Sequence, residues 1–432
     1  MSIHIAIIDD GINEDYYNIG QLDYNIEITQ DLIIQTRHGY DTYENSHGTT
    51  CAAIIRKYAK EVNLSSIKIL TKGTQKGLKA QLIRALEWCV EQKIHLVNLS
   101  AGSVYYKDFK EIEETIQRVT SKGLIIVAAC HNQNIYTAPA SFKQVIGVKC
   151  DLRDIVKAGE YIYSSYIPDG IECIAGSMHR IKNYDGCEEV TSLCNSYAAP
   201  YITYAVSEII KKRPELCLAE IKQELKLSSN KLLIRTDCYK YQLIKYEQQV
   251  INCPTINILN ISGNDIKDIS DGLRTLFRRD GYNAISVCSE NTEEDICNGI
   301  IPINNFNVDR VGIITGRYFL NQTYCVYEPD VMIINLQDQY TIKYLSSSIK
   351  EFMEYDIRIL MIDEVNDTIR KYINRTVNTF NIIIQSSPVE EDFLMKDYKD
   401  FCFKDKGIVN KIYAYILRLL MQDKSEIDKN RT

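Results

Sequence analysis

The sequence predicts an α/β protein of two domains, each a largely parallel sheet with helices on both faces. Two observations lead to this fold class. The chain has 432 residues, 45% of them hydrophobic, which is more than one core usually holds and enough for two. Short apolar runs also alternate with longer amphipathic ones in both halves, the pattern of strands joined by crossover helices.

In the first half, strands are expected where short apolar runs occur, and helices where apolar residues recur at helical spacing. The expected strands are residues 3–8, 66–70, 96–100, 124–129, 145–148 and 171–174. The expected helices are residues 48–59, 78–92, 110–122 and 196–212. Pro200 falls in the first turn of the last helix, where a proline costs little.

A predominantly polar, partly helical stretch, residues 214–252, is expected to connect the two halves, so the predicted domains are 1–213 and 253–432. In the second domain the expected strands are residues 255–262, 284–288, 331–336, 357–363 and 380–386. The expected helices there are residues 266–279, 341–354, 367–375 and 409–421. This order predicts a second doubly wound α/β domain.

Composition narrows the function. The net charge of −7 argues against nucleic acid as a partner, and no apolar stretch approaches the roughly 20 residues needed to span a membrane. The fourteen cysteines lack the paired short spacings of a zinc site, and their number suits buried thiols in a reducing compartment. Residues 3–8 are too short for a signal-peptide core. We therefore expect a cytoplasmic protein that holds neither a metal ion nor a cofactor.

Three residues stand in short motifs that suit catalysis. Asp9 ends the first strand and precedes a glycine turn, where its carboxylate can orient an imidazole. His47 opens a helix of small residues, and the helix N-terminus disfavours imidazolium, which leaves the ring available as a base. Ser196 begins an apolar helix whose first amides can stabilise developing negative charge. Each motif alone is more often structural: a turn-capping Asp, a buried His, an N-capping Ser.

Together, Asp9, His47 and Ser196 resemble the catalytic triad of the subtilisin-like (subtilase) serine proteases, because the order Asp, His, Ser is that family's. The strand that ends at Asn132 is similar to the one that carries the family's oxyanion-hole asparagine. The resemblance covers about residues 3–212. It implies a subtilisin-like fold for the first domain and a serine endopeptidase that cleaves peptide or protein substrates through this triad.

The resemblance also implies a substrate groove. The segment Ser100, Ala101 and Gly102 is similar to the family's substrate-binding strand, whose backbone pairs with an extended peptide. Gly77, just before the helix containing Trp88, resembles the opposite wall of that groove.

Some residues depart from the family. Cys194 and Asn195 stand where the family usually has Gly-Thr. Cys194 therefore brings a side chain close to the oxyanion hole, where the family has none, and Asn195 can replace a hydroxyl donor with an amide donor. Residues 133–138 form a shorter segment than usual, which predicts a shallow or altered specificity pocket. Residues 56–64 are too short for the family's calcium loop. Asp9 lies so near Met1 that we expect no inhibitory propeptide.

Three hypotheses follow. The first is a cytoplasmic subtilisin-like endopeptidase, with removal of a leader from a peptide precursor as a candidate role. The second is a catalytically weak or inactive pseudoprotease that binds peptides or regulates. The third, a nucleotide-regulated enzyme, comes from residues 262–266, which resemble a phosphate-binding loop but lack Gly-Lys-Ser/Thr. A Rossmann-like accessory domain that docks a partner or regulator is the preferred interpretation of residues 253–432.

Overall fold

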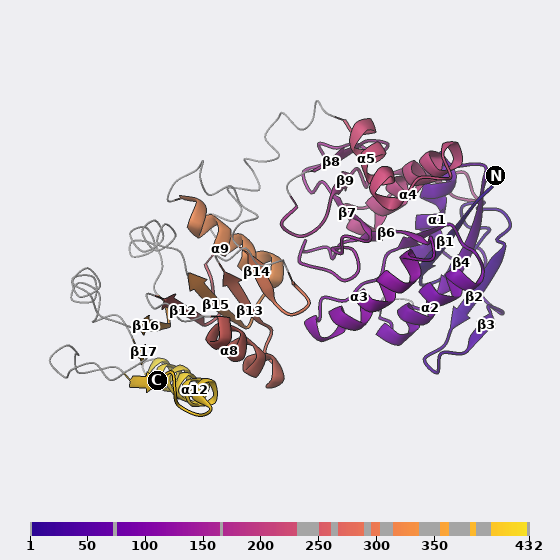
Figure 1. Ribbon diagram of the computed structural model, residues 1–432. Coiled ribbons are helices and arrows are strands. Elements are labelled where there is room, and N and C mark those ends of the chain that lie inside the picture. The colour runs from indigo at the N-terminus through magenta and orange to yellow at the C-terminus, as the bar shows by residue number, and fades with distance from the viewer. Residues whose placement is uncertain are drawn as a thin grey trace. The chain divides into compact units, whose positions relative to one another are not determined.

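The computed structural model describes residues 2–71, 76–164, 167–230, 250–260, 267–288, 295–302, 314–336, 355–362, 381–385 and 399–429. The chain divides into two compact units, Met1–Gln242 and Leu243–Thr432 (Figure 1). Each unit is described by itself. Among the described residues, no helix is both long and apolar enough to cross a membrane.

The first unit is organised around a nine-stranded sheet in the order β3-β2-β4-β1-β5-β6-β7-β9-β8. Its strands are β1 (Ile3–Asp9), β2 (Tyr24–Ile28), β3 (Ile34–Thr36), β4 (Val62–Lys68), β5 (Leu96–Leu99), β6 (Ile125–Ala129), β7 (Ile146–Cys150), β8 (Tyr161–Tyr163) and β9 (Cys173–Ala175). Central β1 runs parallel to β4 and β5, and the antiparallel pairs β2–β3 and β8–β9 lie at the two edges. A parallel strand buried on both faces is continuously apolar, which explains why β1 was recognisable from its sequence.

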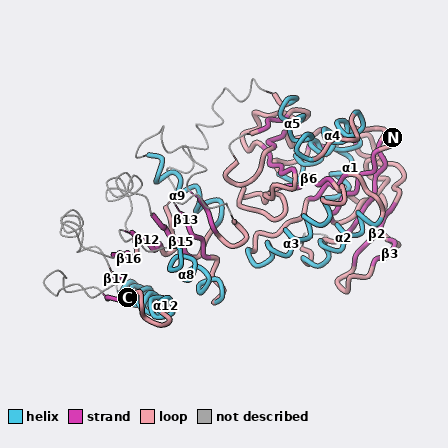
Figure 2. The backbone as a smooth tube through the Cα atoms, viewed as in Figure 1, coloured by secondary structure: helices cyan, strands magenta, loops and turns pink. Residues whose placement is uncertain are grey.

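Described helices cover both faces of this sheet (Figures 1 and 2). On one face α1 (His47–Tyr58) packs against α4 (Asn195–Lys212), and on the other α2 (Lys79–Glu91) packs against α3 (Tyr106–Thr120). The small side chains of Ala52 and Ala199 let α1 and α4 approach the sheet closely, and both are fully buried. Ile5 and Ile7 of β1 lie in the same core, and burying each such side chain contributes about 1.5–3 kcal/mol.

A fifth helix, α5 (Leu218–Ser228), lies within the predicted connector but packs on the first unit. Its Ile221 and Leu225 are fully buried in the core that contains α4. The first unit therefore extends beyond the boundary predicted at residue 213. A short hairpin, β10 (Arg180–Lys182) paired with β11 (Glu188–Val190), was also not predicted. Like the edge strands β3 and β8, its three-residue strands are too short to show a period of two.

The second unit contains a seven-stranded sheet in the order β14-β13-β15-β12-β16-β17-β18, in which every pair is parallel. Its strands are β12 (Thr255–Asn260), β13 (Ala284–Cys288), β14 (Ile300–Pro302), β15 (Val331–Leu336), β16 (Ile357–Ile362), β17 (Ile382–Gln385) and β18 (Lys399–Cys402). The observed bounds of β13 and β15 are those predicted. Strands β14 and β18 were not predicted.

Described helices lie on both faces of this second sheet. Ile333 of β15 shares a core with Leu273 of α8 (Lys267–Arg279) and Ile412 of α12 (Ile408–Lys429). The next residue, Ile334, packs with Phe319 of α9 (Ile314–Tyr327), and successive strand residues point to opposite faces. The predicted loop 262–266 and helices 341–354 and 367–375 lie outside the described residues.

Candidate active site

Asp9 lies at the carboxyl end of β1, where the neighbouring parallel strands β4 and β5 also end. Its side chain is fully buried, and its Oδ1 accepts a hydrogen bond of 2.8 Å from the N–H of Asp10. The chain then turns through Gly11, whose φ of +105° favours glycine, and the Arg37 guanidinium occupies the space that a Cβ would need. The carboxylate of Asp9 is therefore held in one place, away from water.

His47 is the first residue of α1, and two side chains bind the amides of this helix end. Ser46 is the N-cap, and its Oγ accepts from the N–H of Thr49 at 3.2 Å. The carboxylate of Asp10 accepts from the N–H groups of His47 at 3.2 Å and Gly48 at 2.8 Å. Asp10 was not singled out from the sequence, although an acid beside a helix start is the residue type that binds such amides.

Gly48 lets α1 approach the end of β1. A Cβ on Gly48 would lie 2.6 Å from the backbone oxygen of Gly11 and 3.0 Å from the Cβ of Asp9. Any side chain there would push the helix and the strand apart. The separation between His47 and Asp9 therefore depends on the absence of a side chain at position 48.

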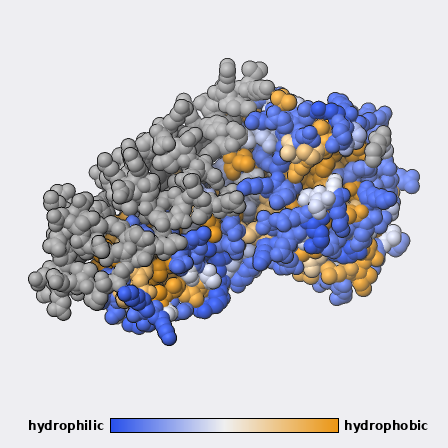
Figure 3. Space-filling model, in the orientation of Figure 1, coloured by the Kyte–Doolittle hydropathy of each residue, from blue (hydrophilic) through white to orange (hydrophobic). Residues whose placement is uncertain are grey.

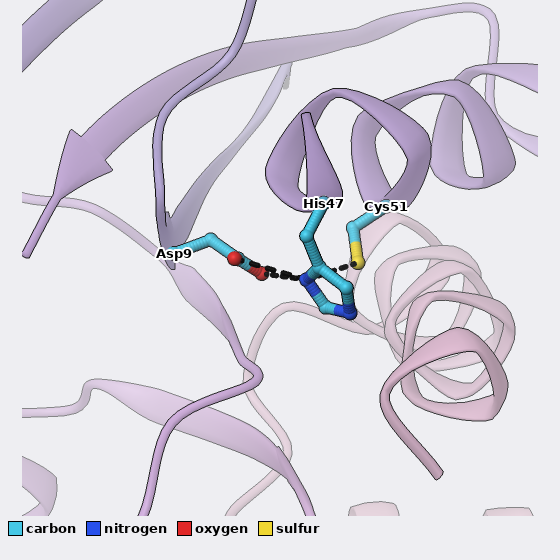
Figure 4. Close-up of side chains that lie close together, drawn as sticks. All are labelled: Asp9, His47 and Cys51. Atoms are coloured by element: carbon cyan, nitrogen blue, oxygen red, sulfur yellow. Dashed lines mark hydrogen bonds and ion pairs between the residues drawn. The ribbon is translucent and has the colours of Figure 1, made fainter. Parts of the chain in front are cut away.

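The three predicted catalytic side chains meet. The Nδ1 of His47 is 2.9 Å and 2.8 Å from the two carboxylate oxygens of Asp9 (Figure 4), and its Nε2 is 2.7 Å from the Oγ of Ser196. A carboxylate can only accept, so Nδ1 carries the proton and Nε2 accepts from the Ser196 hydroxyl. The ring of Tyr197 stacks on the His47 ring, with centroids 5.0 Å apart and planes 23° apart. The imidazole is thus held on both nitrogens and on one face.

Burial opposes a positive charge on His47 and by itself would lower the pKa of the ring. Interactions with Cys51 and with the Asp9 carboxylate outweigh burial, so the pKa of His47 is raised above 6.5. Burial raises the pKa of the Cys51 thiol, which is therefore neutral. We hold the Asp9 carboxylate responsible for the raised pKa, because its negative charge stabilises the protonated ring.

Ser196 lies in the first turn of α4, nearly buried at 8% exposure, with Cys194 as the residue before the helix. The Sγ of Cys194 is 2.8 Å from the Oγ of Ser196 and also donates to the Oδ1 of Asn132 at 3.4 Å. Burial tends to raise the pKa of Cys194, but hydrogen bonds with His47 and Ser196 outweigh it and lower the pKa to about 7. A partly exposed thiol of lowered pKa thus touches the candidate nucleophile.

Asn132 is exposed near the start of the loop that follows β6, and its Oδ1 accepts from the N–H of Asn195 at 3.0 Å. The expectation that Asn195 supplies an amide donor to the oxyanion hole is wrong. Its Nδ2 donates instead to the backbone oxygen of His131 at 2.8 Å and to the Oδ1 of Asn134 at 2.9 Å. Asn195 therefore binds the loop that carries Asn132.

The expected substrate-binding segment directly follows β5. The Oγ of Ser100 lies 3.7 Å from the Sγ of Cys51, on the helix that carries His47. After Ala101, a Cβ on Gly102 would lie 2.8 Å from the backbone oxygen of Ala138. Ser103 and Ala138 form an isolated antiparallel bridge, so this segment adjoins the loop that contains Asn132.

Gly77 lies near the end of β4, where a Cβ would be 2.7 Å from the backbone oxygen of Ile69. It follows Lys76, which forms a bridge with Thr71, and residues 72–75 between them lie outside the described residues. The role of Gly77 as the opposite wall of the groove stays a prediction.

His179 supports the site and was not recognised from the sequence. Its Nε2 donates to the backbone oxygen of Tyr197 at 3.1 Å, so its Nδ1 accepts the 3.1 Å hydrogen bond from the Tyr58 hydroxyl. The side chain is fully buried, and burial, with a smaller contribution from Lys57, lowers the pKa of His179 to about 4. No local motif marks this histidine, because its partners are distant in sequence.

Asp9, His47 and Cys51 offer one metal-ligating atom each, and these atoms lie within 4.8 Å of one another (Figure 4). Protons compete for the same atoms. The Nδ1 of His47 donates to Asp9, and the Cys51 thiol is neutral because burial raises its pKa. A metal ion here would require the loss of both protons.

Comparison with known proteins concerns the first half of the chain. Residues 2–167 match the model of the subtilase family, peptidase S8. Subtilisin DY of Bacillus licheniformis is 22% identical over 246 residues, which cover 54% of this chain and 85% of that protein. Subtilisin BL of Lederbergia lenta is 24% identical over 199 residues, which cover 44% of this chain and 71% of that protein. The serine protease AprX of Bacillus subtilis is 24% identical over 280 residues, which cover 53% of this chain and 61% of that protein.

Among solved structures, a cold-adapted subtilisin-like serine proteinase matches 52% of this chain and 81% of its own, with a TM-score of 0.41 and 20% identity. The family-model match and the sequence relatives show that the first half of the chain is similar to the subtilase family of serine peptidases.

Proposed function

We propose that this chain, whose first half matches the subtilases, is a serine endopeptidase with Asp9, His47 and Ser196 as its triad. The observation that carries the proposal is the continuous path of hydrogen bonds from the Ser196 hydroxyl through the His47 ring to the Asp9 carboxylate. A nucleophile, a base and a group that orients the base are the three parts that acyl transfer needs.

In the proposed reaction, the Oγ of Ser196 attacks the carbonyl carbon of a peptide bond while the Nε2 of His47 takes the hydroxyl proton. Asp9 keeps the proton on Nδ1 and stabilises the imidazolium. His47 then gives its proton to the leaving amine, and a water molecule hydrolyses the acyl-enzyme by the same sequence of transfers. The Asn132 carboxamide and the Ser196 N–H would stabilise the negative oxygen of each tetrahedral intermediate.

The backbone of Ser100, Ala101 and Gly102 is proposed to pair with an extended substrate peptide, which would add a strand. Gly77 would form the other side. Specificity would be narrow because residues 133–138 form a short segment and because the Cys194 side chain occupies space beside the nucleophile. Removal of a leader from a peptide precursor fits such narrow specificity. Comparing cleavage products in matched extracts with and without the protein would identify the substrate.

We place this activity in the cytoplasm. All the cysteines within the described residues are free thiols, which suits a reducing compartment. The second unit is proposed to bind a partner or regulator. A rise in its unfolding temperature on addition of ATP or GTP would favour nucleotide regulation instead.

The alternative function is a pseudoprotease that binds peptides without cleaving them. The contact of 2.8 Å between Cys194 Sγ and Ser196 Oγ favours this alternative, because the thiol occupies space beside the attacking atom. The intact hydrogen-bonded triad favours hydrolysis.

A fluorophosphonate probe separates the two functions, because it phosphonylates only a serine that is activated by its base. We expect the wild type to be labelled and Ser196→Ala to be unlabelled. Ser207→Ala, which removes a buried serine from the same helix, is the matched control and should label like the wild type. A folded wild type that never labels, with candidate substrates present, would support the pseudoprotease.

A further inference from the structure

The side chain of Asn195 is 1% exposed and makes three hydrogen bonds. Its Oδ1 accepts from the N–H of Cys150 at 2.8 Å. Its Nδ2 donates to the backbone oxygen of His131 at 2.8 Å and to the Oδ1 of Asn134 at 2.9 Å. The carboxamide thus connects the end of β7 to the loop after β6, and both of its polar atoms are engaged.

The backbone of Asn195 makes a fourth connection. Its N–H donates to the Oδ1 of Asn132 at 3.0 Å, and the Cys194 thiol donates to the same oxygen at 3.4 Å. Oxygen and nitrogen lie on opposite sides of a planar carboxamide. Holding the Asn132 oxygen against Asn195 therefore directs the Asn132 nitrogen, the only donor of that carboxamide, away from Asn195.

The loop needs such support because it bends sharply. Asn134 has a φ of +58°, and its N–H donates to the backbone oxygen of His131 at 2.8 Å, which closes a tight turn around Asn132. Asn132 itself is exposed at this turn. Two of the turn's acceptors, His131 O and Asn134 Oδ1, are bonded by Asn195, the residue next to the candidate nucleophile Ser196.

We propose that Asn195 is a positioning residue that fixes the Asn132 donor relative to the Ser196 nucleophile. This role rests on the proposed serine-peptidase function and acts through Asn132, without contact between the Asn195 side chain and substrate. Preorganised donors stabilise a transition state only when they are already placed where the negative oxygen will form. A displacement of about 1 Å can cost about 100-fold in rate.

The variant Asn195→Asp tests this role with little change in shape. One carboxylate oxygen still accepts from the N–H of Cys150, while the other places an acceptor against His131 O and Asn134 Oδ1, so two donated hydrogen bonds are lost. The measured quantity is the second-order rate constant for fluorophosphonate labelling of the full-length chain. The four proteins compared are the wild type, Asn132→Ala, Asn195→Asp and the double variant.

Asn132→Ala should slow labelling about 100- to 1,000-fold, the loss known for this type of donor in subtilisin. Asn195→Asp should slow it about 10- to 100-fold. If Asn195 acts through Asn132, the double variant should react at about the rate of Asn132→Ala alone. A purely structural role predicts that the two losses multiply, and that result would overturn the inference.

Asn183→Asp is the matched control. Asn183 Oδ1 accepts from two backbone N–H groups in the β10–β11 hairpin, and its Nδ2 donates to Glu189. This variant should label at the wild-type rate. If Asn195→Asp does not fold, as judged by the fluorescence of Trp88, Asn134→Gly replaces it in the cycle. Glycine tolerates the positive φ and removes one hydrogen-bond partner of Asn195 Nδ2. Asn134→Gly should therefore slow labelling less than Asn195→Asp does, and it should cause no further slowing when Asn132 is already alanine.

Failure of this inference is distinguishable from failure of the proposed function. A labelled wild type with multiplying losses overturns the positioning role alone. A folded wild type that never labels overturns the peptidase function and the positioning role with it.

Discussion

The first unit is expected to lose stability as the pH falls, and part of this loss comes from His179. Replacement of His179 by Gln should remove that part. The folded state holds the pKa of His179 at about 4, compared with 6.5 for an ordinary histidine, because the ring is buried. Below pH 6.5 the unfolded chain therefore takes up a proton that the folded chain does not. This difference destabilises the fold progressively as the pH falls from 6.5 to about 4, and below that no further stability is lost.

The size of this effect follows from the two pKa values. At about 1.4 kcal/mol for each pH unit, a pKa that falls from 6.5 to about 4 corresponds to roughly 3 kcal/mol. In a unit of this size, that corresponds to a decrease of roughly 6–12 °C in the unfolding temperature. Glutamine does not titrate, and its amide can still donate to the backbone oxygen of Tyr197, so His179→Gln should escape this part of the loss.

The assay is thermal unfolding of wild type and His179→Gln at pH 7 and at pH 4, followed by tryptophan fluorescence. Trp88 is the single tryptophan of the chain, it is 6% exposed and it lies in α2, so it reports the first unit. The wild type should lose more stability between the two pH values than the variant does. Equal losses in the two proteins would refute the reasoning, since every other titrating group is common to both.

Three further outcomes are expected. Because the pKa of His47 is raised and only the neutral ring accepts the serine proton, kcat/KM should rise with pH through an apparent pKa above 6.5; a midpoint at or below 6.5 would contradict this. Methyl methanethiosulfonate should abolish fluorophosphonate labelling by adding a methylthio group at Cys194, reversibly with dithiothreitol. Cys194→Ala should still be labelled after this treatment. The control Cys187→Ala lacks an exposed thiol elsewhere in the first unit and should be inactivated like the wild type. Inactivation of Cys194→Ala would show that the reagent does not act through Cys194. Gly48→Ala should slow labelling by about 100-fold and lower the unfolding temperature, because its Cβ would push α1 away from Asp9; a wild-type rate would show that the helix can shift without cost.

Much of the fold and the three side chains of the candidate site could be predicted from the sequence alone, because those signals are local. Buried parallel strands such as β1, β13 and β15 are continuous apolar runs, and their expected and observed bounds agree within one residue. The elements that were missed are mostly short or at sheet edges, such as β3, β8 and β10, where three residues cannot establish a period. The order and local motifs of Asp9, His47 and Ser196 were sufficient to nominate them.

Other features depended on tertiary structure. The same Asn-Ser dipeptide is compatible with an Asn195 amide that faces the hole or one that binds the loop after β6, and only the position of that loop decides between them. His179 became recognisable only once Tyr58 and Tyr197 lay beside it. The sequence of α5 is typical of a polar connector, and only the tertiary structure buries its apolar side chains in the core that contains α4. Periodicity and motif order report contacts between neighbours along the chain, whereas hydrogen bonds between distant residues depend on how all the strands and helices pack together.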